Sequence, residues 1–201
     1  MVPARRLSAA LAGLGLVASL LAGCSSGPAV PTSFAVGVFT QAFSRLGPTV
    51  STAPGIDRTA GRTRRMLPTT IFYPATGATG GRPRSGARPD TGFGPYPLIV
   101  FAPGFGTAPD LAPYPALLGR WAAAGYVVAA VSFPFTSANS PGGPDLSDFA
   151  NQPADLSAVI DGVLADSRHS GTTLSGLVDR HHIGAAGHSL GGVTVLGLVA
   201  N

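Results

Sequence analysis

The pentapeptide Gly187-His188-Ser189-Leu190-Gly191 is the stretch whose residue types and spacing best suit chemistry. In a G-x-S-x-G turn between a strand and a helix, a sharp bend exposes the serine hydroxyl as a nucleophile. Side chains at the two flanking glycines would collide with neighbouring backbone. At the N-terminus of the following helix, the N–H of Leu190 would stabilise developing negative charge. The pentapeptide therefore predicts Ser189 as nucleophile and Leu190 as an oxyanion donor.

The sequence around the pentapeptide carries more weight than the pentapeptide itself, because a chain with 28 glycines produces such matches easily. Residues 183–186 predict a strand before it, and residues 193–199 predict a helix after it, as a nucleophile turn requires. A second motif, Pro103-Gly104-Phe105-Gly106, follows another apolar strand. Its glycines let the backbone approach a substrate carbonyl, so we expect the Phe105 N–H to be the second oxyanion donor. The alternatives are a simple helix cap and an ordinary turn.

The elements that must position these motifs alternate between strand and helix. Apolar strands followed by helical segments favour an α/β fold, with a mostly parallel sheet, right-handed crossovers and helices on both faces. The first two strands mix β-branched and aromatic residues and predict an antiparallel sheet edge. Leu156, Ile160 and Leu164 predict the apolar stripe of the longest helix. The predicted strands are 33–42, 67–73, 97–102, 126–133 and a buried 183–186; the predicted helices are 114–125, 148–166 and 193–199.

Three segments give the chain a resemblance to the α/β-hydrolases. They are LPTTIFYPA from Leu67, PLIVFAPGFG from Pro97 and IGAAGHSLGG from Ile183. More narrowly, the chain is similar to platelet-activating-factor acetylhydrolases, chlorophyllase-like and dienelactone-hydrolase-like enzymes, and bacterial polyester hydrolases. The resemblance implies a serine hydrolase that acts on a small-molecule or lipid-like carboxylic ester through an acyl-enzyme on Ser189. It implies no metal or organic cofactor.

The resemblance also predicts an acid and a base after the nucleophile, and the chain has neither there. The four histidines, at positions 169, 181, 182 and 188, all precede Ser189. We therefore expect residues 33–201 to be the N-terminal part of an α/β-hydrolase domain without its C-terminal part. Such a chain would be nearly inactive alone and would leave the strand at Ile183 as an exposed apolar edge. The alternatives are a non-catalytic surface-anchored binding lipoprotein on this fold, and an acyltransferase that uses an alcohol instead of water.

The N-terminus has the pattern of an export signal. Arg5 and Arg6 precede an uncharged apolar run that ends in Leu21-Ala22-Gly23-Cys24, which resembles a bacterial lipobox. The resemblance implies a signal peptide over 1–23, a palmitate-type lipid anchor on Cys24, a tether over 24–32, and a place on the outer face of the cell membrane. A secreted protein or a membrane-spanning anchor with an incidental cysteine is the alternative.

Charge argues against nucleic acid as a partner. Without the two leader arginines, 11 basic residues face nine acidic ones, so the remaining chain is close to neutral. Cys24 is the only cysteine, so it has no partner for an internal disulfide. The sequence specifies no oligomeric state.

Metabolic labelling with a fatty acid tests the anchor. We expect the wild-type chain to incorporate the label and Cys24→Ala to lose it, because the sulfur of Cys24 is the predicted acceptor. Equal labelling of both proteins would contradict the lipoprotein interpretation.

Overall fold

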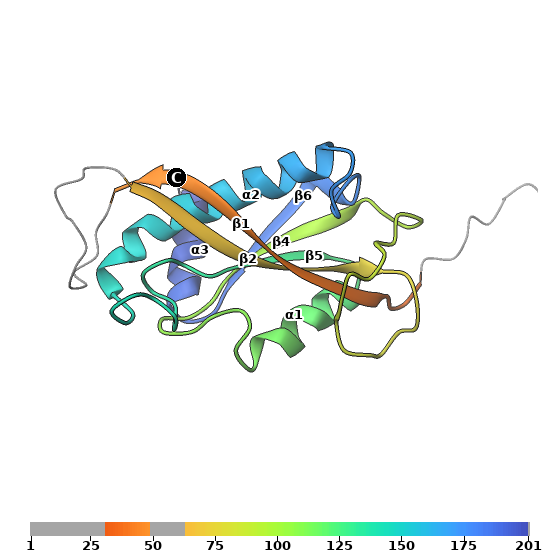
Figure 1. Ribbon diagram of the computed structural model, residues 1–201, viewed down its shortest axis with the longest axis horizontal. Helices are drawn as coiled ribbons and strands as arrows, with labels where there is room; N and C mark the ends of the chain where they lie inside the picture. The colour runs from red at the N-terminus through yellow and green to blue at the C-terminus, as the bar shows by residue number, and fades with distance from the viewer. Residues whose placement is uncertain (1–30, 49–62, 201) are drawn as a thin grey trace, which may run out of the picture. The chain divides into compact units, whose positions relative to one another are not determined.

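The computed structural model describes residues 31–48 and 63–200, and these form a mixed sheet of six strands with helices on both faces (Figure 1). The signal peptide, Cys24 and most of the tether lie outside the described residues. The elements in chain order are β1 (Ala35–Gly47), β2 (Thr63–Ala75), β3 (Arg84–Ser85), β4 (Tyr96–Ala102), α1 (Tyr114–Ala123), β5 (Val127–Val131), the 3-10 helix η1 (Leu146–Asn151), α2 (Gln152–Arg168), β6 (Val178–Gly187) and α3 (Leu190–Ala200).

The strand order is β3-β1-β2-β5-β4-β6, so the sheet has an antiparallel and a parallel part. β1 pairs antiparallel with β2, and β2 pairs antiparallel with β5. β5, β4 and β6 run parallel to one another. The carboxyl ends of β4, β5 and β6 therefore meet at one edge of the sheet, where the loops after β4 and β6 carry the two predicted motifs.

The direction of the crossovers explains why the helices cover both faces. The chain moves one way along the sheet from β4 through α1 to β5, and the opposite way from β5 through α2 to β6. Crossovers of the same hand that run in opposite directions lie on opposite faces of a sheet. Figure 1 accordingly shows α1 on one side of the strands and α2 on the other. The expected α/β-hydrolase architecture, with helices on both faces, is confirmed.

Each face of the sheet has its own apolar core. On one side, Tyr114, Leu118 and Ala122 of α1 pack against the sheet. On the other, the apolar residues Leu156, Val159 and Val163 of α2 are buried together with apolar residues from every long strand. The predicted stripe was correct at Leu156 but wrong in its spacing, because a step of four residues drifts around a helix with 3.6 residues per turn. Ile160 and Leu164 flank the stripe and are partly buried.

The single helix predicted over 148–166 is wrong at its start. Residues Leu146–Asn151 form a 3-10 helix, and α2 begins at Gln152. The cause is Pro153, which has no N–H to continue an α-helical ladder from the preceding turn and is favoured in the first turn of a new helix. The N–H of Gln152 instead bonds the carbonyl of Phe149, three residues back.

The sequence predicted that the apolar strand at Ile183 would be an exposed edge in this chain, and the structure confirms this. β6 is the edge strand, and Ile183 is 40% exposed. The adjacent helix α3 exposes Val193, Leu196 and Val199, with Val199 reaching 79% exposure. These four side chains form an apolar surface along β6 and α3, the same edge that the sequence predicted would be open. No helix among the described residues is long and apolar enough to cross a membrane.

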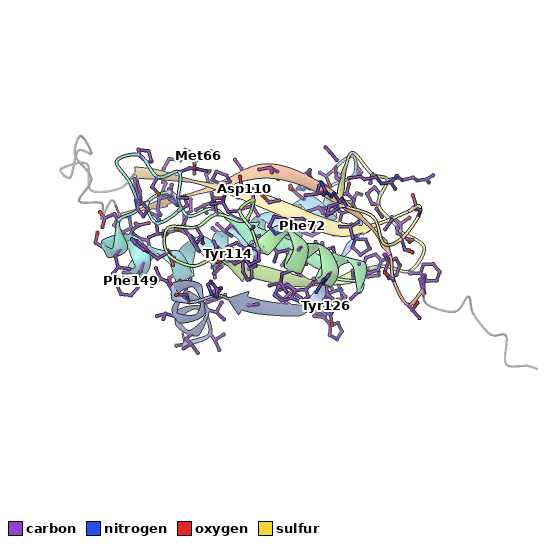
Figure 2. The ribbon with its side chains drawn as sticks, turned by 90° about the horizontal axis from the view of Figure 1, so that it is seen from below. Met66, Phe72, Asp110, Tyr114, Tyr126 and Phe149 are labelled. Carbon is purple, nitrogen blue, oxygen red and sulfur yellow. The ribbon has the colours of Figure 1, made fainter. Side chains whose placement is uncertain are left out.

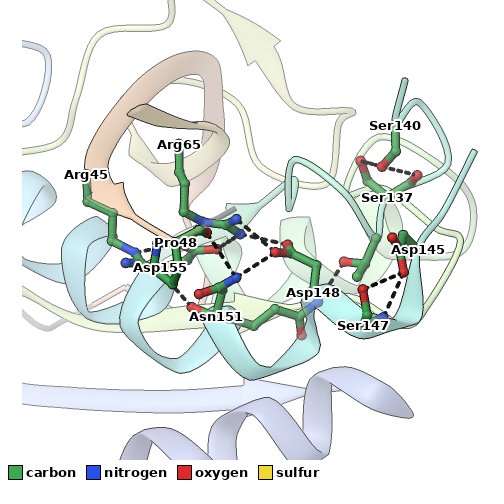
Figure 3. A network of polar contacts seen from close by, with 12 residues as sticks. Arg45, Pro48, Arg65, Ser137, Ser140, Asp145, Ser147, Asp148, Asn151 and Asp155 are labelled. Carbon is green, nitrogen blue, oxygen red and sulfur yellow. Dashed lines mark hydrogen bonds and ion pairs between the residues drawn. The ribbon is translucent and has the colours of Figure 1, made fainter. Parts of the chain in front are cut away.

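Buried charge ties the antiparallel strands to α2 (Figure 3). The fully buried guanidinium of Arg65 donates to Asp148 at 2.8 and 2.7 Å and to Asp155 at 2.9 and 2.6 Å. Arg45 donates to the same Asp155 at 2.6 Å, so two positive charges meet two negative ones. Burial alone lowers the pKa of Arg65, but the hydrogen bonds and charges of both aspartates outweigh it and hold the pKa above its ordinary value. The cluster joins β1 and β2 to η1 and α2.

Arg65→Met tests this cluster. The substitution keeps most of the side-chain volume but leaves two buried carboxylates with one arginine between them. We expect the free energy of unfolding, measured by urea denaturation, to fall by about 3–5 kcal/mol. Arg64→Met is the matched control, because the neighbouring Arg64 is exposed and should change stability by less than about 0.5 kcal/mol. An equal fall in the free energy of unfolding in the two variants would show that the buried cluster stabilises the fold no more than an exposed arginine does.

Candidate active site

Ser189 lies in the bend between β6 and α3 with a backbone φ of 53°. It is the one residue other than glycine with a positive φ among those the structure describes. Such a conformation costs an L-residue about 1–3 kcal/mol, so it persists only where the surrounding structure demands it. The bend is closed by hydrogen bonds from the Gly191 N–H to the His188 carbonyl and from the Gly192 N–H to the Ser189 carbonyl, both 2.9 Å. The Ser189 side chain is exposed at the carboxyl edge of the sheet.

The two glycines of the pentapeptide allow backbone contacts that no other residue would permit. A Cβ at Gly187 would lie 2.2 Å from the carbonyl oxygen of Gly191. A Cβ at Gly191 would lie 2.0 Å from the carbonyl oxygen of Ala102, the last residue of β4. Both positions therefore require glycine. The second contact holds the turn at residues 187–191, called the elbow below, directly against the end of the neighbouring strand β4.

The loop after β4 lies beside Ser189. A Cβ at Gly104 would be 3.5 Å from the Cβ of Ser189 and 3.1 Å from Nδ1 of His188. Phe105 follows with a 42% exposed side chain. The hydrogen bonds among the described residues use neither the Phe105 N–H nor the Leu190 N–H. The structure thus brings together Ser189 and the two elements that carry the predicted oxyanion donors.

The connections after β4 and β6 also leave the sheet on opposite faces at this point. From the carboxyl end of β4 the chain passes to α1 on one face of the sheet, and from the neighbouring β6 it passes to α3, which packs with α2 on the other face. Adjacent parallel strands whose connections leave on opposite sides form the usual ligand site of an open α/β sheet. The residues at this point are Phe105 and Ser189.

The hydroxyl of Tyr114 links the two motifs. The Gly104 N–H donates to it at 3.1 Å, and the hydroxyl lies 2.9 Å from Nδ1 of His188. Because the oxygen accepts from Gly104, its own proton is available to the imidazole nitrogen. The two rings also meet edge to face, with centroids 5.9 Å apart. Figure 2 shows Tyr114 at α1, on the face of the sheet opposite α2. Tyr114 therefore holds the β4 loop against the elbow.

None of the four histidines bonds the Ser189 hydroxyl, although all four lie in the described part of the chain. His169 bonds the carbonyl of Ala165, and His182 bonds Asp179. His181 and His182 stand in an irregular segment near the start of β6, at the end of the strand remote from Ser189. His188 is engaged with Tyr114. Within the described residues, Ser189 has no imidazole base.

Three aromatic residues that follow the central strands, Phe105, Phe133 and Phe135, do not line one pocket. Phe133 and Phe135 line a cavity of about 560 Å³ at the carboxyl end of β5, next to the first residues of β2. Neither Phe105 nor Ser189 lines that cavity. Phe133 is also part of the main core, so it serves packing as well.

Sequence reasoning missed Tyr114. It stands ten residues after Gly104 at the first position of a helix, where no short motif marks it. Tyr114 is only 4% exposed and ends in a polar hydroxyl. Only the tertiary structure shows which groups that hydroxyl bonds.

Comparison with solved structures supports the fold. No protein-family profile matches the chain, and no curated protein matches it. Among solved structures, it is similar to a ferulic acid esterase from Streptomyces cinnamoneus, with 26% sequence identity and a TM-score of 0.58. The match covers 87% of this chain and 57% of the esterase, so the chain spans a little over half the length of that protein. The mixed sheet, its two helical layers and this likeness identify the fold as that of the α/β-hydrolases.

Proposed function

We propose that this protein hydrolyses carboxylic esters through an acyl-enzyme on Ser189. The observation that carries the proposal is the strained Ser189, held at positive φ by glycine contacts on β4, with the Gly104–Phe105 backbone beside it. A strained residue at the end of a sheet, next to free backbone N–H groups, is typical of a nucleophile turn. The likeness to a ferulic acid esterase supports an ester as the substrate.

The chemistry follows from the arrangement. The Ser189 oxygen attacks the ester carbonyl carbon while a base takes its proton, and the carbonyl oxygen becomes an oxyanion between the N–H groups of Phe105 and Leu190. The intermediate collapses by breaking the bond to the alcohol oxygen, which leaves with the proton held by the base. Water then attacks the acyl-enzyme in the same way and releases the carboxylic acid and free Ser189.

The base is the part of this mechanism that the described residues do not contain. All four histidines are described, and none bonds Ser189. We propose that in the whole protein the imidazole and its orienting carboxylate come from residues outside those described, since the match covers only 57% of the esterase.

We further propose that the enzyme acts from the outer face of a bacterial membrane, held by a lipid on Cys24. The lipobox-like sequence supports this, and the near-neutral charge of the remaining chain gives no reason to expect a nucleic-acid partner. An anchored hydrolase would meet small-molecule or lipid-like esters outside the cell.

Ser189→Ala tests the nucleophile. In the complete gene product we expect the rate of p-nitrophenyl acetate hydrolysis to fall at least about a thousandfold, because the acyl group loses its acceptor oxygen. Ser157→Ala, at an exposed position of α2, should keep the rate within twofold. The 201-residue chain should show no rate above its own Ser189→Ala variant. A clear Ser189-dependent rate in the short chain would show that a base is present in it after all.

Tyr114→Phe tests the link between the two motifs. Removing the hydroxyl leaves the buried Gly104 N–H unpaired and frees the loop from His188, so we expect kcat to fall roughly tenfold because the Phe105 donor moves. Tyr126→Phe is the matched control, since Tyr126 is exposed at the opposite end of the α1 face (Figure 2). If both variants keep wild-type kcat, Tyr114 does not position the loop.

A further inference from the structure

A buried amide, Gln152, lies between α3, which begins at the proposed donor Leu190, and the loop after β5, which bonds the loop that carries Phe105. Gln152 is the first residue of α2 and is 1% exposed. Its Nε2 donates to Oγ1 of Thr136 at 2.6 Å, and its Oε1 accepts a short hydrogen bond from Oγ1 of Thr194. Both threonines are 2% exposed. The three side chains form a continuous hydrogen-bonded row from the loop after β5 to α3.

One end of this chain reaches the nucleophile helix. Thr194 lies one turn after Leu190 in α3, and its hydroxyl is also 3.2 Å from the Leu190 carbonyl oxygen. The N–H of Leu190 is one of the two proposed oxyanion donors. A bond that holds Thr194 in place therefore holds the first turn of α3.

The other end reaches the oxyanion loop. The carbonyl of Thr136 accepts from the Gly106 N–H at 2.8 Å, and the Ala138 N–H donates to the Thr107 carbonyl at 3.3 Å. These two backbone bonds fasten residues 136–138 to the residues that follow Phe105. Gly106 has a φ of 68°, so the loop turns sharply at this bond.

The chemistry of a primary amide suits this position. Thr136 and Thr194 each offer a hydroxyl, and an amide presents a donor at one end and an acceptor at the other. Whichever way the amide is turned, it bonds both hydroxyls at once. Since a buried polar group without a partner is costly, the amide fits this place only while both threonines stay within bonding distance. Gln152 thus bridges the loop after β5, through Thr136, and α3, through Thr194.

We propose that Gln152 is a positioning residue that sets the distance between the Phe105 and Leu190 oxyanion donors. The inference rests on the proposed ester hydrolysis at Ser189. Two donors stabilise an oxyanion only when both reach the same oxygen, so a shift of about 1 Å between their elements weakens the transition state far more than substrate binding.

Gln152→Met and Thr194→Val test the proposal in the complete gene product, with ester hydrolysis followed over a range of substrate concentrations. Both substitutions keep the side-chain volume and remove the polar link. We expect kcat to fall roughly tenfold to a hundredfold, with KM changed less than threefold. Thr194→Ser restores the hydroxyl and should keep kcat within about threefold of the wild type.

Thr69→Val is the matched control for destabilisation. Thr69 is fully buried and bonds the Leu67 carbonyl at 3.0 Å within β2, so its loss should lower the melting temperature without lowering kcat more than twofold. An equal fall in kcat in Thr69→Val and Thr194→Val would overturn the proposal, because the effect would then be general. It would also be overturned if Gln152→Met kept kcat within twofold while Ser189→Ala abolished turnover. If Ser189→Ala kept its activity, the proposed function itself would fail.

Discussion

The contact between Gly191 and the end of β4 is the constraint on which the site depends. The backbone of Gly191 lies so close to Ala102 that a Cβ on Gly191 would be 2.0 Å from the Ala102 carbonyl oxygen. This approach turns the chain sharply after β6, forces Ser189 to positive φ and starts α3 at Leu190. The same approach brings the loop after β4 next to the serine. Position, strain and neighbouring donors at Ser189 thus share one steric cause.

Such a contact needs a rigid frame, and the frame is largely apolar. The two apolar cores pack the central strands between α1 and α2, so the carboxyl ends of β4 and β6 stay in register. Polar groups act at selected points within this frame. Tyr114 joins the β4 loop to the elbow from the α1 face. On the α2 face, Gln152 joins α3 to the loop after β5, and the Thr136 carbonyl of that loop accepts from the Gly106 N–H of the β4 loop. The Arg65 cluster lies further along the sheet and fastens the antiparallel strands to α2, the helix that carries Gln152.

Apolar side chains along β6 and α3 are exposed, whereas those of the two cores are buried. Leu196 and Val199 are more exposed than apolar residues of a helix usually are, and β6 offers an unpaired strand edge. Helix α3, which carries three of these exposed side chains, begins directly after Ser189.

Local pattern was enough to predict much of this protein. Runs such as 97–102 and 126–133 are apolar on both faces, and the glycines at 187 and 191 have a purely local steric meaning, so the strands, the helices and the elbow followed from nearest neighbours. The error at the start of α2 also has a local cause, because Pro153 separates a 3-10 helix from the α-helix that follows.

The sequence by itself determined which residues could act in catalysis, because five consecutive residues define a nucleophile turn. Only the tertiary structure decided what surrounds them. Tyr114, Thr136, Gln152 and Thr194 come from separate elements, and no spacing along the chain marks them as partners. Their hydrogen bonds exist because the sheet order brings the β4 loop, α2 and α3 to one edge, and a buried polar group must find its partner there.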